Sequence, residues 1–188
     1  MLTSEETADL VHRAQRGQVD AFTGLVRAYL RAAYAVALSV VKRPADAEDI
    51  AQEAFLKAFQ RLDTCREPER FVAWLLQIAR NRALNFLESR RLRDVAPEGG
   101  RILEFTTTPS ESAGMRHDLL AALADLDDRQ REVVLLHDLE NWTHAEIGAA
   151  LDISEVMSRQ HLFQARQLMR TRLGDAMPLE LNHGRRTD

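Results

Sequence analysis

Apolar side chains recur at helical spacing along most of this chain. The clearest example is the stretch 70–93, where they follow the i, i+3, i+4, i+7 spacing of a single helix face. The residues on this face are Phe71, Trp74, Leu75 and Ile78, continued with some drift by Leu84 and Leu87. The pattern predicts a helix with one buried side. The place of Trp74 on this side favours packing of its ring in the core over stacking of the ring on a nucleic-acid base.

Three more helices are expected before this one, over residues 4–15, 20–42 and 46–62. Each begins at a residue whose side chain can accept a hydrogen bond from the first helical turn. The expected N-caps are Ser4, Asp20 and Asp46. Polar residues and a proline at 63–69 indicate a loop, so the first four helices are expected to pack together.

The helical pattern fails between residues 94 and 112. This stretch contains two prolines, a Gly-Gly pair and a run of threonine and serine, which is typical of a flexible linker. It also contains a short apolar patch, formed by Ile102, Leu103 and Phe105. The patch could dock into a groove, or the linker could simply tether its two neighbours.

Helical spacing returns at Met115 and predicts four more helices, near 115–126, 128–139, 144–151 and 155–173. Thr143 and Glu146 have the spacing of a capping box at the start of the third of these. The third and fourth helices are separated by a short turn, and small residues at 149–150 permit them to cross closely. This pair is therefore a candidate helix-turn-helix.

Glycine and proline are scarce, at 8 and 5 residues, and the alternation typical of strands is nearly absent. We therefore predict an all-α protein of two small helical domains joined by a flexible linker. The expected boundaries are 1–93 for a helix bundle, 94–112 for the linker, 113–174 for the helix-turn-helix domain and 175–188 for a tail.

The formal net charge of -4 does not favour binding of nucleic acid over the whole protein surface. Any contact with nucleic acid has to come from local basic faces. One such face lies on 70–93, where six arginines accompany one acid. Arginine neutralises phosphate, and asparagine offers both a donor and an acceptor to base edges. The candidate contacts are Arg80, Asn81, Arg82 and Asn85. A core helix with a solvated basic face would explain the same residues equally well.

Charge also divides the C-terminal half of the chain. Residues 117–153 contain nine acids, whereas the helix 155–173 is basic. Its basic residues are Arg159, His161, Arg166, Arg170 and Arg172, and its one acid is Glu155. This polarity fits a recognition helix that faces phosphates while the other helices face elsewhere.

A cluster of acids with one glutamine lies on the helix 46–62. Its members are Asp46, Glu48, Asp49, Gln52 and Glu53. Acids near a helix N-terminus gain from the helix dipole, which explains them without any function. The same cluster could also be a docking surface for a basic partner.

Several chemistries find no support in the sequence. The single cysteine, Cys65, excludes an internal disulfide and a multi-cysteine zinc site, and we expect it to be semi-exposed and incidental. The six histidines lack metal-ligand spacing, and no phosphate-binding loop, dinucleotide turn or nucleophile motif is present. We therefore expect no enzyme activity, no metal and no cofactor. The absence of a long apolar run and the acidic N-terminus favour a cytoplasmic protein without membrane insertion.

Three segments, taken in order, resemble bacterial sigma factors of the extracytoplasmic-function group, within the sigma-70 family. They are DAEDIAQEAFLKAF at 46–59, FVAWLLQIARNRALNFL at 71–87 and LADLDDRQREVVLLHDLENWTHAEIGAALDIS at 123–154. The resemblance extends over about residues 8–172. It implies a subunit that gives RNA polymerase its promoter specificity, in a stress or envelope response. The first domain (sigma-2) would melt and read the -10 element, and the last (sigma-4) would read the -35 element.

The resemblance also implies partners. They are the RNA polymerase core, through its β and β′ subunits, promoter DNA, and an anti-sigma factor that covers both DNA-reading domains until a signal arrives. The surface that grips the clamp helices of β′ corresponds by position to Asp49, Gln52 and Glu53. Asn81 and Asn85 correspond to contacts with the non-template strand.

The loop 62–70 corresponds to a pocket for a flipped-out base. Such a pocket makes physical sense, because a melted strand needs cationic and amide side chains along its path and a cavity for an unstacked base.

The -35 contacts implied by the resemblance are Arg159, Gln160, His161, Phe163, Gln164 and Arg166. Gln160, His161 and Gln164 stand where the family usually has a serine and two arginines. Because glutamine can read adenine edges, we expect the fold to survive and the -35 sequence to differ from the common one. Asp152 replaces the usual turn glycine, and an aspartate can tolerate a left-handed conformation there.

A stand-alone helix-turn-helix regulator is the alternative interpretation. It would account for residues 143–172 but would leave the acidic cluster and the arginine-asparagine face unexplained. Such a regulator would bind a defined duplex without polymerase, so a gel shift with the protein alone separates the two possibilities.

Overall fold

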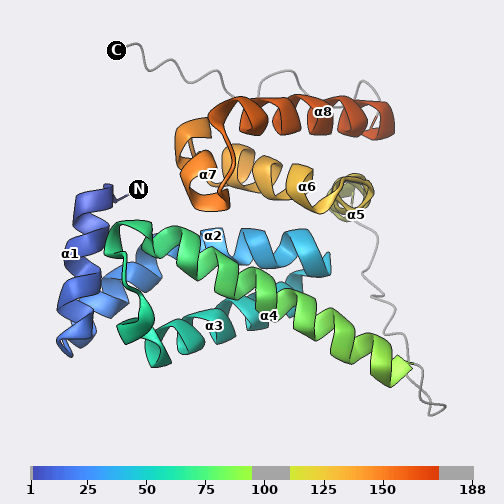
Figure 1. Cartoon of the computed structure of the whole chain (residues 1–188). Coiled ribbons are helices and arrows are strands. Elements are labelled where there is room, and N and C mark those ends of the chain that lie inside the picture. The colour runs from blue at the N-terminus through green and yellow to red at the C-terminus, as the bar shows by residue number, and fades with distance from the viewer. Residues whose placement is uncertain (1, 95–110, 174–188) are drawn as a thin grey trace.

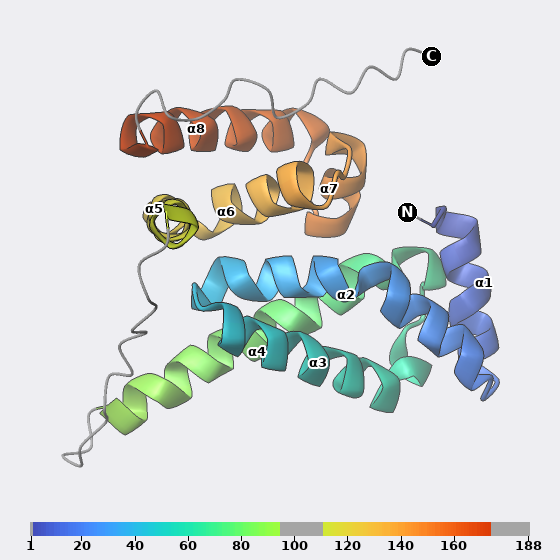
Figure 2. The same cartoon turned by 180° about the vertical axis from the view of Figure 1, so that it is seen from behind.

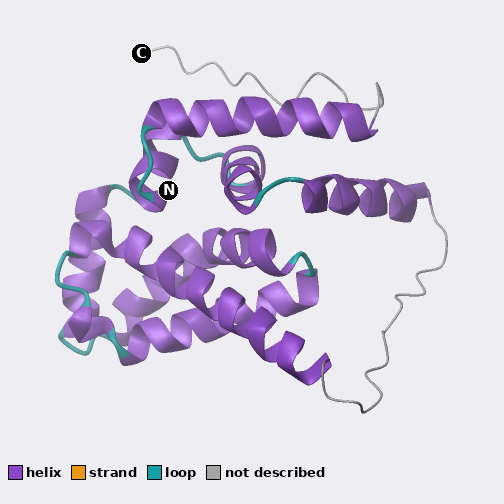
Figure 3. Cartoon of the chain, turned by 45° about the vertical axis from the view of Figure 1, so that its right-hand side comes forward, coloured by secondary structure: helices purple, strands orange, loops and turns teal. Residues whose placement is uncertain are grey.

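The structure is a computed structural model that describes residues 2–94 and 111–173. Within these two stretches every regular element is a helix and no strand is present (Figure 3). The prediction of an all-α fold with two helical domains is therefore confirmed. Most of the expected linker, including its apolar patch at 102–105, and the whole expected tail lie outside the described residues.

The first body contains four helices and two short 3₁₀ turns. In chain order these are α1 (Ser4–Gln15), α2 (Val19–Val41), α3 (Pro44–Gln60), η1 (Leu62–Thr64), η2 (Pro68–Arg70) and α4 (Phe71–Asp94). Figures 1 and 2 show α4 crossing the pair α2 and α3 and continuing past them. The C-terminal half of α4 therefore projects from the bundle.

Helix α2 is the central element of this body. It is long and apolar enough to cross a membrane by length and composition, but it packs against α1, α3 and α4. Its C-terminal half is rich in small buried residues, namely Ala32, Ala33, Ala35, Val36 and Ala37. Small side chains let neighbouring helices approach closely from several sides, so burial in the bundle accounts for the apolar length of α2.

The second body contains α5 (Glu111–Asp125), α6 (Asp128–Val134), η3 (Leu135–Leu139), α7 (His144–Leu151) and α8 (Glu155–Leu173). The pair α7 and α8 forms the predicted helix-turn-helix, and α8 packs on α5 and α6 (Figure 1). The predicted single helix 128–139 is correct only in its first half, because η3 is a π-helical turn. Widening the last turn lets the Glu140 N–H donate to the carbonyl of Leu135.

Local signals set the turn of the helix-turn-helix. The predicted capping box is present, because the Thr143 side chain accepts from the Glu146 N–H and the Glu146 carboxylate accepts from the Thr143 N–H. Asp152 adopts the expected left-handed conformation, with φ of 56°. Gly148 lets the backbone of the turn pass close to α7, since a Cβ there would lie 2.8 Å from the carbonyl oxygen of Ile153.

The three predicted N-caps lie one to three residues after the observed ones. Thr3, not Ser4, caps α1, because Thr3 forms a complete capping box with Glu6. Helix α2 starts at Val19 without a side-chain cap. Helix α3 starts at Pro44, since the fixed φ of proline suits the first helical position, and this places Asp46 inside the first turn.

Several large apolar residues at helical spacing are exposed instead of packed in the core. They are Leu30, Phe59, Leu84, Leu119 and Leu139. The cause is clearest on α4, where the projecting half has no helix to cover it. Phe59 packs edge-on against Phe22, with ring centroids 4.9 Å apart.

The second body rests on the first, with α6 and η3 against α2 and α7 against α4 (Figures 1 and 2). Two adjacent charged residues of α6, Arg131 and Glu132, are almost fully buried at this contact, with 1% and 0% exposure. Ionised groups in such a place have to be paired or hydrogen-bonded, because burial removes their hydration.

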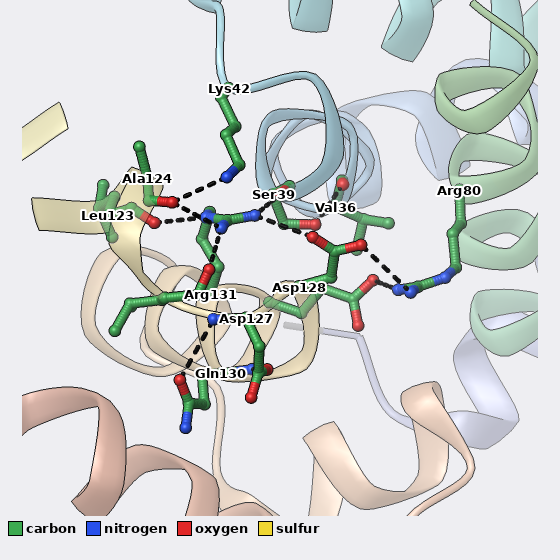
Figure 4. Close-up of polar contacts among 12 residues, drawn as sticks. Val36, Ser39, Lys42, Arg80, Leu123, Ala124, Asp127, Asp128, Gln130 and Arg131 are labelled. Carbon is green, nitrogen blue, oxygen red and sulfur yellow. Dashed lines mark hydrogen bonds and ion pairs between the residues drawn. The ribbon is translucent and has the colours of Figure 1, made fainter. Parts of the chain in front are cut away.

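Arg131 meets this requirement through backbone carbonyls (Figure 4). Its guanidinium donates to the carbonyl of Leu123 in the last turn of α5, to that of Leu126 just after α5, and to that of Ser39 near the end of α2. Asp128 lies 3.2 Å from the same guanidinium. Arg131 therefore caps α5 and ties the second body to α2.

Polar contacts continue along the whole contact between the bodies. Lys42 donates to the Ala124 carbonyl at 2.7 Å (Figure 4). Arg31 lies 3.0 Å from Glu140. Glu132, one of the nine acids of 117–153, is buried against the first body, where it pairs with Arg80.

We expect replacement of Arg131 by methionine to loosen this contact. Methionine keeps much of the apolar volume but leaves the carbonyls of Ser39, Leu123 and Leu126 without their donor. The unfolding free energy should fall by about 2–4 kcal/mol. Urea denaturation measures the loss, and small-angle X-ray scattering should show a larger radius of gyration.

Arg27→Met removes an exposed arginine of α2 and is the matched control. An Arg131→Met protein with the stability and radius of gyration of the Arg27→Met control would contradict the structural role given to Arg131.

Candidate nucleic-acid interface

The arginine-asparagine face predicted on α4 is present as one surface. Asn81, Arg82 and Asn85 are exposed, and the Asn81 side chain accepts from the Gln77 amide at 3.1 Å. Arg82 forms an ion pair with Glu53 of α3. The amide groups are therefore open to a ligand, whereas Arg82 shares its charge with the acidic cluster.

Arg80 differs from its neighbours because the second body partly covers it. Its guanidinium pairs with Glu132 and lies 3.9 Å from Asp128 (Figure 4). Burial raises the pKa of Glu132 even though Arg80 and Arg129 favour its ionised form. A nucleic-acid phosphate that contacted Arg80 would have to compete with this buried carboxylate.

The loop between α3 and α4 borders a cavity of about 460 Å³. The first body contributes Cys65, Arg66, Trp74 and Gln77, among others, and the second contributes Arg129, Leu151 and Asp152. The cavity thus lies beside the loop 62–70, as the resemblance implies for a base pocket, but α6 and α7 form part of its wall.

Two residues of this wall bear on predictions made from the sequence. Cys65 is buried in the hydrophobic core rather than semi-exposed, and burial raises the pKa of its thiol. A protonated, covered thiol is a poor nucleophile. Trp74 is partly buried and packs against Phe71, with ring centroids 5.9 Å apart, so it belongs to the edge of the core while also lining the cavity.

The acidic cluster lies on α3. Glu48, Asp49, Gln52 and Glu53 are exposed, whereas Asp46 is half-buried and lies 3.3 Å from Arg90. None of the ion pairs among the described residues involves Asp49. Glu48 and Gln52 also line a groove of about 500 Å³ that continues to Tyr34 of α2 and Leu139 of η3; its other residues include Leu30, Arg31, Ala51 and Glu140.

The predicted -35 residues lie on α8. Arg159, Gln160, Phe163 and Gln164 are exposed, and His161 and Arg166 are half-buried. The opposite side of α8 packs on the second body through Ser158, Leu162, Ala165 and Met169. The helix therefore presents one long side to solvent.

Asp138 of η3 fixes one flank of α8. It accepts from Arg166 at 2.5 and 3.3 Å, and it lies 2.8 Å from Nδ1 of His137. Burial opposes ionisation of Asp138, but the hydrogen bonds from His137 and Arg166 prevail and lower its pKa. Asp138 was not identified from the sequence, because its partner is 28 residues away along the chain.

A pair of histidines connects η3 with the helix-turn-helix. The rings of His137 and His144 stack with centroids 4.7 Å apart, and Nδ1 of His144 lies 2.9 Å from the hydroxyl of Ser158 on α8. Burial, together with the neighbouring His137, lowers the pKa of His144. Nowhere in residues 2–94 and 111–173 do three or more His, Cys, Asp or Glu side chains form a group that could hold a metal ion.

The fold and these surfaces define the class of protein: a two-domain, all-helical chain whose second domain ends in a helix-turn-helix. Models of two sigma factor regions match it, Sigma-70 region 2 over residues 25–93 and Sigma-70 region 4 over residues 116–169. The chain belongs to the sigma-70 family, in the extracytoplasmic-function (ECF) group, and is an RNA polymerase sigma factor.

Curated relatives agree with this assignment. RNA polymerase sigma-H factor of Pseudomonas aeruginosa is 32% identical over 181 residues, which cover 89% of this chain and 93% of the relative. ECF RNA polymerase sigma-E factor of Escherichia coli K12 is 30% identical over 179 residues, 87% of this chain and 93% of the relative. RfaY of Xanthomonas campestris, named a probable sigma factor, is 34% identical, but the match spans only 43% of its length.

Two solved structures share the fold. CnrH in complex with the cytosolic domain of CnrY has a TM-score of 0.65 at 24% identity, and the match covers 92% of this chain and 99% of CnrH. The sigma factor RpoE of Bartonella quintana, in complex with the anti-sigma factor NepR, has a TM-score of 0.62 at 22% identity, with 83% and 98% covered.

We expect Asp138→Asn to destabilise the second body in a pH-dependent way. Asp138 has a lowered pKa in the folded chain, so its ionised form contributes stability above the unfolded pKa, and this contribution is lost as the pH falls through the folded pKa. The variant should be less stable by about 1–3 kcal/mol near neutral pH, and the difference should shrink in acid. Urea unfolding at a series of pH values measures it.

Asp63→Asn, at an exposed aspartate of η1, is the control and should show no such pH dependence. A stability difference for Asp138→Asn that stays constant from neutral pH into acid would refute the lowered pKa of Asp138.

Proposed function

We propose that this sigma factor works through three separate surfaces: α3 docks on core RNA polymerase, α4 contacts the melted -10 element and α8 contacts the -35 element. The observation that carries the proposal is the order of these surfaces on one chain. An exposed acidic helix, an exposed arginine-asparagine helix and an exposed recognition helix follow one another within the regions that match the sigma family.

The docking partner of α3 is a basic surface on the polymerase, and the resemblance assigns it to the clamp helices of β′. Asp49 is the best-placed anchor, because it is exposed and takes part in none of the ion pairs among the described residues. Docking through α3 would also draw Glu53 away from Arg82, which lies on the DNA face of α4. Polymerase binding and DNA contact are thereby coupled.

Contact with both promoter elements requires the two bodies to separate. Elements centred at -10 and -35 lie about 25 base pairs apart, which is roughly 85 Å of duplex at 3.4 Å per pair. A compact chain of this size has a radius of gyration of only about 16 Å. The residues between α4 and α5 (95–110), if extended, span at most about 60 Å, which together with the bodies themselves is enough.

The packed arrangement therefore represents the resting form, in which the second body covers Arg80 and the loop pocket. An anti-sigma factor is the proposed partner that holds this form, in keeping with the CnrY and NepR complexes of the two structural relatives. The protein acts in the cytoplasm and supplies binding energy only, while polymerase makes the bonds. Its proposed domains are 1–93 and 113–174, separated by the linker 94–112.

The test of this function is run-off transcription with purified core polymerase on genomic fragments. Adding the protein should produce new start sites, and the protein alone should not shift a defined duplex in a gel. If core polymerase gains no start sites in the absence of an inhibitor, the proposed function fails. A tight, sequence-specific duplex complex without polymerase would instead favour a stand-alone regulator.

We expect Asp49→Lys to weaken binding to core polymerase by about tenfold or more, because it reverses an unpaired charge at the proposed interface. Asp20→Lys, an identical replacement at an exposed position of α2, is the control. Fluorescence anisotropy of labelled protein with core enzyme measures both affinities. Equal affinities for the two variants would remove Asp49 from the docking surface.

A further inference from the structure

The side of α8 that faces solvent carries no charge along its middle. Four buried residues, at 158, 162, 165 and 169, mark the side that packs on the second body. At 100° per residue, the positions opposite them are Val156, Gln160, Phe163, Gln164 and Gln167. All five are exposed, and the two apolar members are among the most exposed large residues of the chain, at 68% for Val156 and 64% for Phe163.

The arginines of α8 lie on its two flanks. Arg159, Arg166 and Arg170 share one flank, where they line a hollow of about 200 Å³ beside Phe163. Arg172 lies on the other flank, 3.4 Å from Asp125 of α5. Arginines therefore border, on both sides, an uncharged strip formed by the five residues named above.

Two of these arginines are turned away from the strip by acids. Arg159 pairs with Glu155 one turn earlier, and Arg166 is held by the half-buried carboxylate of Asp138. A guanidinium that reads a guanine must direct two N–H groups at O6 and N7 of that base. In this structure the guanidinium groups of Arg159 and Arg166 instead donate hydrogen bonds to Glu155 and Asp138 at the edge of the helix.

The uncharged strip has its own base chemistry. A glutamine amide can donate to N7 and accept from N6 of adenine in a bidentate contact. Apolar side chains such as those of Phe163 and Val156 pack against the C5 methyl group of thymine. Three glutamines with two apolar residues, and no arginine between them, therefore suit the major-groove edge of A·T pairs.

We infer that α8 reads a -35 element whose contacted base pairs are A·T, with Gln160, Gln164 and Gln167 on adenines and Phe163 on a thymine methyl group. This inference rests on the proposed function, since it specifies the sequence that the recognition helix selects. Arg170, which takes part in none of the ion pairs among the described residues, supplies a phosphate contact, which positions the helix without selecting a base.

The experiment uses the full-length protein with core polymerase. A promoter found by run-off mapping is resynthesised with its upstream element randomised, and the templates that yield RNA are sequenced. The contacted positions should show A or T over G or C by about tenfold each. Enrichment of G at those positions, or a flat base composition while transcription proceeds, would overturn the inference.

A charge-matched pair of variants links the preference to the strip. Gln164→Arg places a guanidinium in the middle of the strip, so it should convert the preference at one position from A to G. Gln60→Arg adds the same charge at an exposed position at the end of α3 and should leave every preference unchanged. An unaltered A preference with Gln164→Arg would show that this glutamine reads no base.

The failure of the inference is distinguishable from that of the proposed function. If holoenzyme makes RNA from the parent promoter but selects G·C pairs upstream, only the base assignment is wrong. If no template yields RNA above the level of core polymerase alone, the assignment of α8 to a -35 element falls with the proposed function itself.

Discussion

The burial of Arg131 and Glu132 between the two helical bodies is the interaction on which the packed structure depends. Removing two charges from water is costly, and here backbone carbonyls and two arginines compensate for it. The contact between the bodies is therefore rich in charged groups, unlike the alanine-rich packing within the first body. When the bodies part, these groups regain hydration while each body retains apolar packing of its own. A polar contact of this kind can open without unfolding either partner.

The same charged groups connect the packed form with the proposed contacts. Arg80 is shared between Glu132 and the -10 face, and Arg82 is shared between Glu53 and that face. Glu132 and Glu53 each form an ion pair with an arginine that a DNA phosphate would otherwise contact. Docking of α3 on polymerase and departure of the second body would release these two arginines by separate routes. Under the proposed function, these two arginines of a net acidic chain would become available to the -10 element only after polymerase docks and the bodies part.

Features with local causes could be predicted from the sequence, and features with distant causes could not. The helix-turn-helix, the capping box at Thr143 and the left-handed Asp152 follow from residues within four positions of one another. The pairing of Arg80 with Glu132 joins residues 52 positions apart, so helical periodicity carries no sign of it. One signal was available: an arginine-rich helix and an acid-rich segment in the same chain have complementary charge. The role of Gly148 depends on the backbone of a turn that folds against it, and the exposed end of α4 depends on where its neighbours stop.

The central claim is that the two bodies are packed together in the free protein and apart on the promoter. Spin labels at exposed positions 57 of α3 and 171 of α8, in a chain with Cys65→Ser, allow the distance between the bodies to be measured by double electron-electron resonance. The account predicts one narrow distance distribution in the free protein and a distance longer by tens of ångströms in the complex with core polymerase and promoter DNA. An unchanged distance in a transcriptionally active complex would contradict it.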